Sequence, residues 1–152
     1  MVCREFSKLI YGTSSPTSGR PLFHVAPGER VSRYLTDKEE YSRTRKIVRH
    51  SAFMPPTKIP RKSVYWTSSL PEAEIWSIGD EYVAPQRGAI LARGDLNSYQ
   101  ALRNTNLAIE LTGKPHPRHA DIVGFHTDRQ KARLQAVKLA EQAELVVRPI
   151  MP

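Results

Sequence analysis

The chain has 152 residues, 39% hydrophobic and 25% charged, with a formal net charge of +8, which suits one folded domain and excludes a collagen-like, repetitive or largely unfolded chain. It lacks the run of roughly 18 apolar residues that a transmembrane helix needs, and its start, Met1 to Phe6, lacks the apolar stretch of a secretory signal. One cysteine, Cys3, excludes an internal disulfide and a cysteine-based zinc cage, so we expect a single cytoplasmic domain over residues 1–152 with no membrane partner.

Turn and strand signals alternate at the beginning of the chain. Residues 12–19 are rich in Gly, Ser and Thr, and this composition predicts a flexible loop. Residues 21–26 and 31–35 have the composition of short strands.

The next segment predicts a helix followed by an irregular loop. Thr36 and Glu39 have the spacing of a capping box, which predicts a helix over about residues 37–49. Residues 54–62 contain three prolines, which lack an amide donor and disfavour regular structure in their neighbours. We therefore expect residues 54–62 to form an exposed basic loop.

Residues 63–126 predict short strands with two short helices between them. One helix covers residues 72–78, and Asp95 or Asn97 can cap a second helix that ends at Leu102. Strand composition covers residues 63–67, 88–93, 107–111 and 121–125.

The most regular helical pattern lies in the last part of the sequence. Thr127 and Gln130 have capping-box spacing and predict a helix over residues 128–142, followed by a strand at residues 145–147. This helix has an apolar stripe that must pack on a sheet or another helix. The stripe consists of Ala132, Ala136, Leu139, Ala140 and Ala143. Together the elements predict an α+β fold, a single domain with a mixed β-sheet, several short helices and a C-terminal amphipathic helix.

Histidine and acidic residues do not form a recognisable metal motif. His116 and His119 are three residues apart, but the prolines at 115 and 117 prevent the helix that would aim both at one ion. His119 and Asp121 would share one face of a strand, without a third ligand at a recognisable spacing. We therefore expect His119 and Asp121 to form a hydrogen-bonded pair on the surface, and we expect no metal.

Two segments resemble ADP-ribosyltransferase-like domains. Leu22-Phe23-His24-Val25-Ala26 resembles the family's first strand, in which an aromatic-His pair near the strand end helps to hold NAD. Ser63-Val64-Tyr65-Trp66-Thr67-Ser68-Ser69, a helix, and then the segment from Gly88 to Leu96 are similar to the family's second block. In that block a strand with Tyr and a Ser/Thr cluster leads through a helix to a strand ending in Asp-Leu. The resemblance covers about residues 20–96 and implies an α+β domain that uses NAD.

The resemblance also implies roles for individual residues in NAD binding. His24 would contact the NAD ribose, and Tyr65 would pack on the nicotinamide ring. The Ser/Thr cluster, formed by Thr67, Ser68 and Ser69, would support the site by hydrogen bonds. His24 and Tyr65 should then lie on neighbouring strands beside one pocket.

The catalytic acid of this family has no matching motif in the chain. We take Glu110 for this role, because strand alternation points it away from the core that Leu107, Ile109 and Leu111 require. The expected catalytic residues are therefore Glu110 and Tyr65.

The positive charge is concentrated in residues 30–62, which hold ten basic residues and three acidic ones. The predicted helix end and the proline-rich loop folded beside it would bring these cations to one surface that follows a phosphate backbone. Tyr34, Tyr41 or Trp66 would stack on unpaired bases. The candidate nucleic-acid-binding residues are Arg43, Arg45, Lys46, Arg49, Lys58, Arg61 and Lys62.

Two interpretations of function follow from these observations. The first is an ADP-ribosyltransferase-like domain that uses NAD and acts on or near nucleic acid. The alternative is a non-catalytic basic module that binds nucleic acid or an acidic protein partner through residues 30–62. No motif for sequence-specific nucleic-acid recognition is present.

Overall fold

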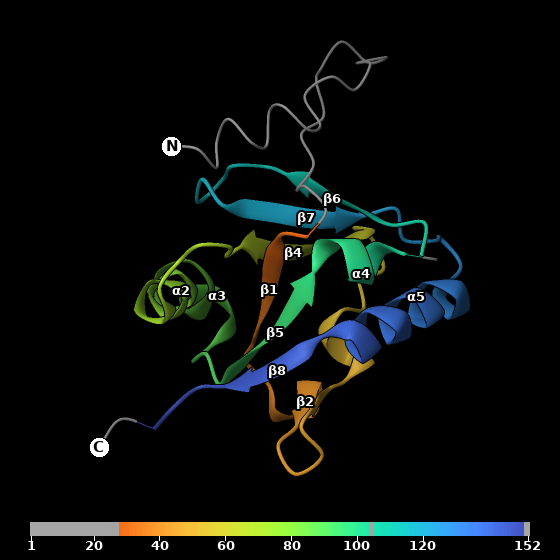
Figure 1. Ribbon diagram of the computed structural model, residues 1–152. Helices are drawn as coiled ribbons and strands as arrows, with labels where there is room; N and C mark the ends of the chain where they lie inside the picture. Colours follow the sequence, from red (N-terminus) through yellow and green to blue (C-terminus); the bar gives the residue numbers. More distant parts are fainter. Residues whose placement is uncertain (1–27, 104, 151–152) are drawn as a thin grey trace.

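The computed structural model describes residues 28–103 and 105–150 (Figure 1). The predicted loop at residues 12–19, the strand at residues 21–26 and the candidate NAD-binding residue His24 therefore lie outside the described residues.

The described residues form a six-stranded sheet with the strand order β6-β7-β4-β1-β5-β8 (Figure 1). Each of its neighbouring strand pairs is antiparallel. The strands are β1 (Arg30–Leu35), β4 (Arg61–Trp66), β5 (Ala92–Asn97), β6 (Ala108–Leu111), β7 (His119–Val123) and β8 (Glu144–Val147). With the helices described below, this sheet confirms the predicted α+β fold class.

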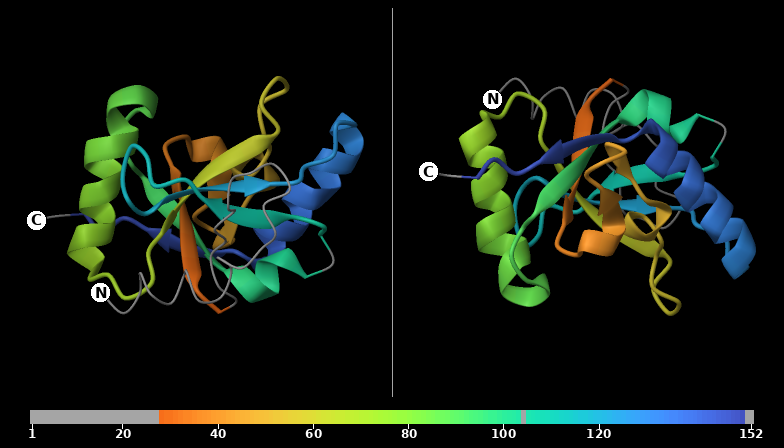
Figure 2. Two further views of the ribbon diagram at one scale, coloured as in Figure 1. Left: turned by 90° about the horizontal axis from the view of Figure 1, so that it is seen from above. Right: turned by 90° about the horizontal axis from the view of Figure 1, so that it is seen from below.

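Helices cover both faces of the sheet. Helix α2 (Glu72–Ile78), a π-helical turn η3 (Gly79–Val83) and α3 (Ala84–Arg87) form a continuous layer on one side, whereas α5 (Arg129–Gln142) lies on the other (Figure 2). A short helix, α4 (Ser98–Leu102), contacts α5.

Each face of the sheet has its own hydrophobic core, because successive side chains of a strand point to opposite faces. Val31, Leu35 and Val64 pack in the cluster that includes the buried residues of α5. Tyr34 and Tyr65 point to the other face and pack against α2 and η3. The second, aromatic cluster is the one that borders the candidate site described below.

Helix α5 confirms the predicted C-terminal amphipathic helix. The predicted stripe is buried in the core, with Ala143 partly buried beside it. The N-cap is Asp128, whose carboxylate accepts hydrogen bonds from the backbone N–H groups of Gln130 and Lys131 at 2.9 and 3.1 Å. The capping residue therefore lies one position after the predicted Thr127.

The predicted helix over residues 37–49 is wrong. Only a 3₁₀ turn, η1 (Lys38–Glu40), forms there, capped by Asp37 and Glu40 in a capping box. It is followed by a hairpin of β2 (Tyr41–Ser42) and β3 (Ile47–Val48), and by a second 3₁₀ turn, η2 (His50–Ala52). The hairpin turn contains Lys46 with φ of 58°. Tyr, Ile, Val and Thr in this segment favour extended structure, and burial of Val48 in the core stabilises it over the helical alternative.

The boundaries of β5 and β4 also differ from the predictions. The strand expected at residues 88–93 is β5 at Ala92–Asn97, because α3 ends at Gly88 with φ of 109°. Asp95 therefore lies inside β5, and Asn97 caps α4 by accepting a hydrogen bond from the Tyr99 N–H at 3.0 Å. Strand β4 begins at Arg61, so Arg61 and Lys62 belong to the sheet and not to the proline-rich loop.

Candidate active site

Strands β1 and β4 diverge in the middle of the sheet. They pair only at Val31 with Trp66 and at Ser32 with Tyr65, although β1 continues beside β5 and β4 continues beside β7. The Arg33 side chain spans the divergence and donates hydrogen bonds to the carbonyl oxygens of Ala52 at 3.1 Å and Ser63 at 2.9 Å. The sheet therefore opens into a cleft between its two halves.

This cleft has a volume of about 240 Å³. Three tyrosines, Tyr34, Tyr65 and Tyr82, form aromatic walls, while His119 and the cations Arg33 and Arg87 supply most of its polar character. It combines residues from the sheet, the α2–α3 layer and the β6–β7 loop, which are far apart in the sequence.

Tyr65 lies in the centre of the aromatic wall. Its ring makes edge-on contacts with Tyr34 and His119, with centroid distances of 5.6 and 5.1 Å. Burial raises the pKa of Tyr65, so its hydroxyl is protonated at neutral pH. That hydroxyl has no hydrogen-bond partner among the described residues. It is therefore a donor available to a molecule in the cleft.

His119 is fixed by hydroxyl groups on both sides. Its Nδ1 lies 2.5 Å from Thr112 Oγ1, and its Nε2 lies 3.1 Å from Ser63 Oγ. Burial lowers the pKa of His119, with the neighbouring Asp121 acting in the opposite direction. The imidazole is therefore neutral at neutral pH, with its ring held against Tyr65.

Two carboxylates lie on the same face of the sheet, beyond His119. Glu110 on β6 is directly opposite Asp121 on β7, and Arg61 forms ion pairs with both of them. Asp121 lies closer to the cleft, with its Oδ1 3.9 Å from His119 Nε2. Strand β7 separates Glu110 from Tyr65, and Glu110 does not line the cleft.

Asp121 is therefore a carboxylate nearer to the cleft than Glu110, although it does not line the cleft either. The two-residue spacing of His119 and Asp121 did predict that they share a strand face, and the register confirms it. The sequence predicted a hydrogen-bonded pair on the surface, but both residues are buried, and their 3.9 Å separation is longer than a hydrogen bond. Only the position of β7 beside β4 shows that His119 lines the aromatic cleft, with Asp121 next to it but outside the lining.

The predicted Ser/Thr cluster lies around Arg30 and does not line the cleft. Thr67 Oγ1 accepts a hydrogen bond from Arg30 Nε at 3.1 Å and lies 2.8 Å from Ser32 Oγ. Ser68 Oγ accepts from the Arg30 N–H at 2.6 Å, whereas Ser69 is exposed with φ of 69°. In this structure Thr67 and Ser68 join the end of β4 to the start of β1.

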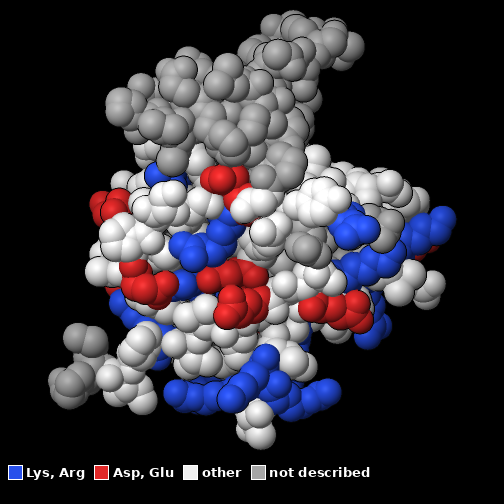
Figure 3. Space-filling model, in the orientation of Figure 1, with Lys and Arg blue, Asp and Glu red and all other residues white. Residues whose placement is uncertain are grey.

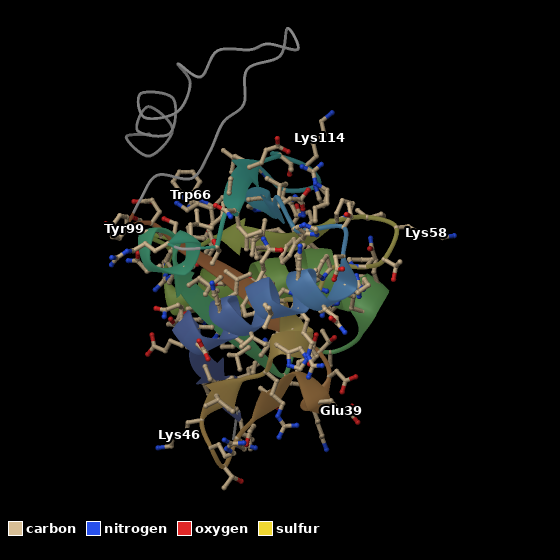
Figure 4. The ribbon with its side chains drawn as sticks, turned by 90° about the vertical axis from the view of Figure 1, so that its right-hand side faces the viewer. Glu39, Lys46, Lys58, Trp66, Tyr99 and Lys114 are labelled. Atoms are coloured by element: carbon tan, nitrogen blue, oxygen red, sulfur yellow. The ribbon has the colours of Figure 1, made fainter. Side chains whose placement is uncertain are left out.

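The cations of residues 30–62 do not form the single surface that was expected. Arg43, Arg45, Lys46 and Arg49 are exposed on the β2–β3 hairpin and its flank, and basic side chains gather there at the lower edge of Figure 3. Lys58, at the tip of the proline-rich loop, projects from a different part of the molecule than Lys46 (Figure 4).

The other two candidate cations belong to β4. Arg61 is engaged with Glu110 and Asp121, and Lys62 is partly buried beside Arg33 and Arg87. The expected surface fails because the helix does not form and because β4 begins at Arg61. Tyr34 and Trp66 are also buried, with 1% and 6% of their surface exposed, so they do not present a face for base stacking.

The described residues contain neither a metal-binding cluster nor a membrane-spanning helix. Within residues 28–103 and 105–150, no group of three or more His, Cys, Asp or Glu side chains is arranged to hold a metal ion. In the same part of the chain, no helix is long and apolar enough to cross a membrane.

Comparison with models of known families found no match for this chain, and comparisons with curated proteins and with solved structures found none either.

Proposed function

We propose that the chain is an ADP-ribosyltransferase-like domain that binds NAD in the cleft between β1 and β4. The observation that carries this proposal is Tyr65, the residue that the resemblance assigns to nicotinamide packing. It lies in an aromatic wall of the cleft and has no hydrogen-bond partner for its hydroxyl among the described residues.

The shape of the cleft supports one end of a dinucleotide as its occupant. Its volume of about 240 Å³ is below the range of about 300–1,000 Å³ typical of pockets that enclose a drug-sized ligand. The nicotinamide ring and its ribose therefore fit the aromatic part of the cleft, and the rest of NAD extends beyond the cleft. A cationic nicotinamide ring packs favourably on the face of a tyrosine ring, which Tyr65 and Tyr82 can supply in the cleft.

The reaction breaks the bond between nicotinamide and the ribose C1′, and nicotinamide leaves as a neutral molecule with the bonding electron pair. An acceptor oxygen or nitrogen then forms the new bond to C1′ and releases its proton to solvent. Positive charge develops on the ribose in the transition state, and a nearby carboxylate stabilises it. Asp121 is nearer to the cleft than Glu110, so we assign this role to Asp121, with Glu110 and Arg61 holding its orientation.

Binding of NAD to the wild-type chain, measured by calorimetry, tests this proposal. Tyr65→Phe should weaken NAD binding by about three- to tenfold, because one hydrogen bond to the ligand is lost. The matched control is Tyr99→Phe, which alters an exposed tyrosine with 52% of its surface accessible and should leave binding unchanged. Absence of NAD binding at millimolar concentration, in a chain with a normal unfolding transition, would reject the proposal.

A second candidate function, electrostatic binding of nucleic acid, is favoured by the β2–β3 hairpin. Arg43, Arg45, Lys46 and Arg49 are exposed, and none of them has a carboxylate partner among the described residues. Exposed, unpaired cations on a protruding hairpin can follow a phosphate backbone. Up to four contacts would give a log–log salt slope of roughly −3 to −4 for duplex DNA.

A salt titration of oligonucleotide binding tests this second function. Replacing Arg43, Arg45 and Lys46 together by Gln should flatten the slope, whereas Lys131→Gln on α5 should not. Binding of an acidic peptide with equal affinity and the same dependence on these residues would assign the hairpin to a protein partner instead.

A further inference from the structure

Three cations with too few negative partners converge where the sheet opens. Arg33 comes from β1, Lys62 from β4 and Arg87 from α3, and Arg33 is almost completely buried, with 7% of its surface exposed. Among the described residues, the one carboxylate paired with this group is Glu40, whose Oε2 lies 3.4 Å from Arg87 Nη2. We call Arg33, Lys62 and Arg87 the cleft cations.

Backbone carbonyl groups hold two of the cleft cations in place. Arg33 donates from Nε and Nη1 to carbonyl oxygens of Ala52 and Ser63, and its Nη2 has no acceptor among the described residues. Arg87 donates from Nη1 to the carbonyl oxygen of Tyr34 at 3.1 Å. Both guanidinium groups line the cleft. They are therefore fixed before any ligand binds, which reduces the entropy lost on binding.

The charge of this cluster is costly in the absence of a ligand. The Lys62 ammonium has neither a hydrogen-bond acceptor nor a carboxylate partner among the described residues. Burial and repulsion from Arg33 and Arg87 lower the pKa of Lys62 to about 7. Buried cations are normally paired, and an unpaired group of them gains most from a multivalent anion.

We propose that Arg33 and Arg87, which line the cleft, bind the diphosphate of a nucleotide whose ring packs against the tyrosines of the cleft, while Lys62 adds to the positive field without lining the cleft. This inference rests on the proposed function for the identity of the natural nucleotide, and it adds the residues that hold the phosphate groups. Arginine guanidinium groups can donate two parallel hydrogen bonds to phosphate oxygens. The adjoining aromatic wall favours a nucleotide over inorganic phosphate.

Calorimetric titration with inorganic pyrophosphate and with ADP tests the site without requiring any reaction. Wild-type protein should bind both, and ADP should bind more tightly because its base contacts the aromatic wall. Arg87→Gln should weaken pyrophosphate binding at least about tenfold, Arg87→Lys should retain part of it, and the exposed Lys131→Gln on α5 should match wild type. Wild-type affinity in Arg87→Gln, or no pyrophosphate binding by a folded wild-type chain, would overturn the inference.

Glu40→Gln provides a test that does not remove a cation. Glu40 Oε1 accepts hydrogen bonds from the N–H groups of Thr36 and Asp37, and the glutamine side-chain oxygen can keep them. Loss of the negative charge should strengthen pyrophosphate binding several-fold, and weaker binding in a folded variant would overturn the inference. NAD binding that persists without pyrophosphate binding would reject this site alone, whereas pyrophosphate and ADP binding without NAD binding would reject the proposed function alone.

Discussion

Tyr65 and His119 lie directly opposite each other in the register of β4 and β7, with ring centroids 5.1 Å apart and ring planes at 83°. His119 is in turn held by Thr112 and Ser63, so the Tyr65 ring contacts a fixed partner on the side away from Tyr34. This pair makes the aromatic wall rigid at the point where the sheet opens.

The buried imidazole of His119 predicts that acid destabilises the fold. Its pKa is lowered in the folded state, so between the folded pKa and about 6.5 the unfolded chain binds more protons. The contribution of His119 to the free energy of unfolding should therefore be constant above that window and fall as the pH decreases through it. Urea unfolding between pH 7.5 and 5 should show a smaller acid effect in His119→Gln than in the wild type. Equal pH dependence in the two proteins would show that His119 is not buried as a neutral group.

Gly79 lies under the Tyr34 ring and leaves no room for a side chain. A Cβ atom at this position would be 2.8 Å from two ring carbons of Tyr34. Gly79→Ala should therefore displace Tyr34 and destabilise the protein by about 1–3 kcal/mol. Ser77→Ala, at an exposed position of α2, should change the free energy of unfolding by less than about 0.5 kcal/mol. If Gly79→Ala were as stable as this control, the Tyr34 ring would not be confined as described.

Patterns within a single segment of the sequence predicted those elements whose type and buried side are set by that segment alone. The stripe of α5 specified both its helix and its buried side. The helix at residues 72–78 was predicted from the capping-box spacing of Ser69 and Glu72 and from Gly79 at its end, although its N-cap is Pro71. The hairpin at residues 41–48 was missed because its spacing of apolar residues also fits a helix. The choice depends on burial of Val48 over Gly94, where an added Cβ atom would lie 3.2 Å from Val48.

The candidate site was only partly predictable for a similar reason. Tyr65 was singled out by the resemblance of its segment to ADP-ribosyltransferase-like domains, but its neighbours His119, Arg33 and Arg87 come from three other elements. Which strand lies beside β4 is decided by the topology of the whole sheet. Asp121 could therefore be paired with His119 from the sequence, but neither could be assigned to the cleft.

A buried ionic network beneath α2 predicts strong dependence on Arg93. Arg93 is 2% exposed and donates hydrogen bonds to Asp95 at 2.9 Å and to both carboxylate oxygens of Glu72 at 2.9 and 2.8 Å. Arg93→Met would leave the Asp95 carboxylate buried with Ser32 as its remaining partner. We expect a loss of about 3–5 kcal/mol in the free energy of unfolding. Arg129→Met, at a partly exposed hydrogen bond to Pro55, should cost much less.

Lys62 predicts a second pH effect on stability, of the same sign as that of His119 but in the alkaline range. Its pKa falls from 10.5 to about 7 on folding, because of burial among Arg33 and Arg87, with Glu40 the one opposing charge. Between these values the unfolded chain binds more protons, so the free energy of unfolding should rise from pH 7 to 9.5, by on the order of 2 kcal/mol. Lys62→Met should lose this rise. Saturating pyrophosphate should reduce it as well, since the bound anion favours the charged ammonium.

Release of nicotinamide from NAD tests the central claim most directly, because it reports reaction in the cleft without knowledge of the acceptor. The wild-type chain should release nicotinamide, and Asp121→Asn should reduce the rate by about 10²–10³-fold, since a charge that stabilises the transition state is lost. Glu110→Gln should reduce the rate less, and Glu141→Gln, at an exposed position of α5, should have no effect. A folded wild-type chain that releases no nicotinamide, or an Asp121→Asn variant as active as the wild type, would contradict the account.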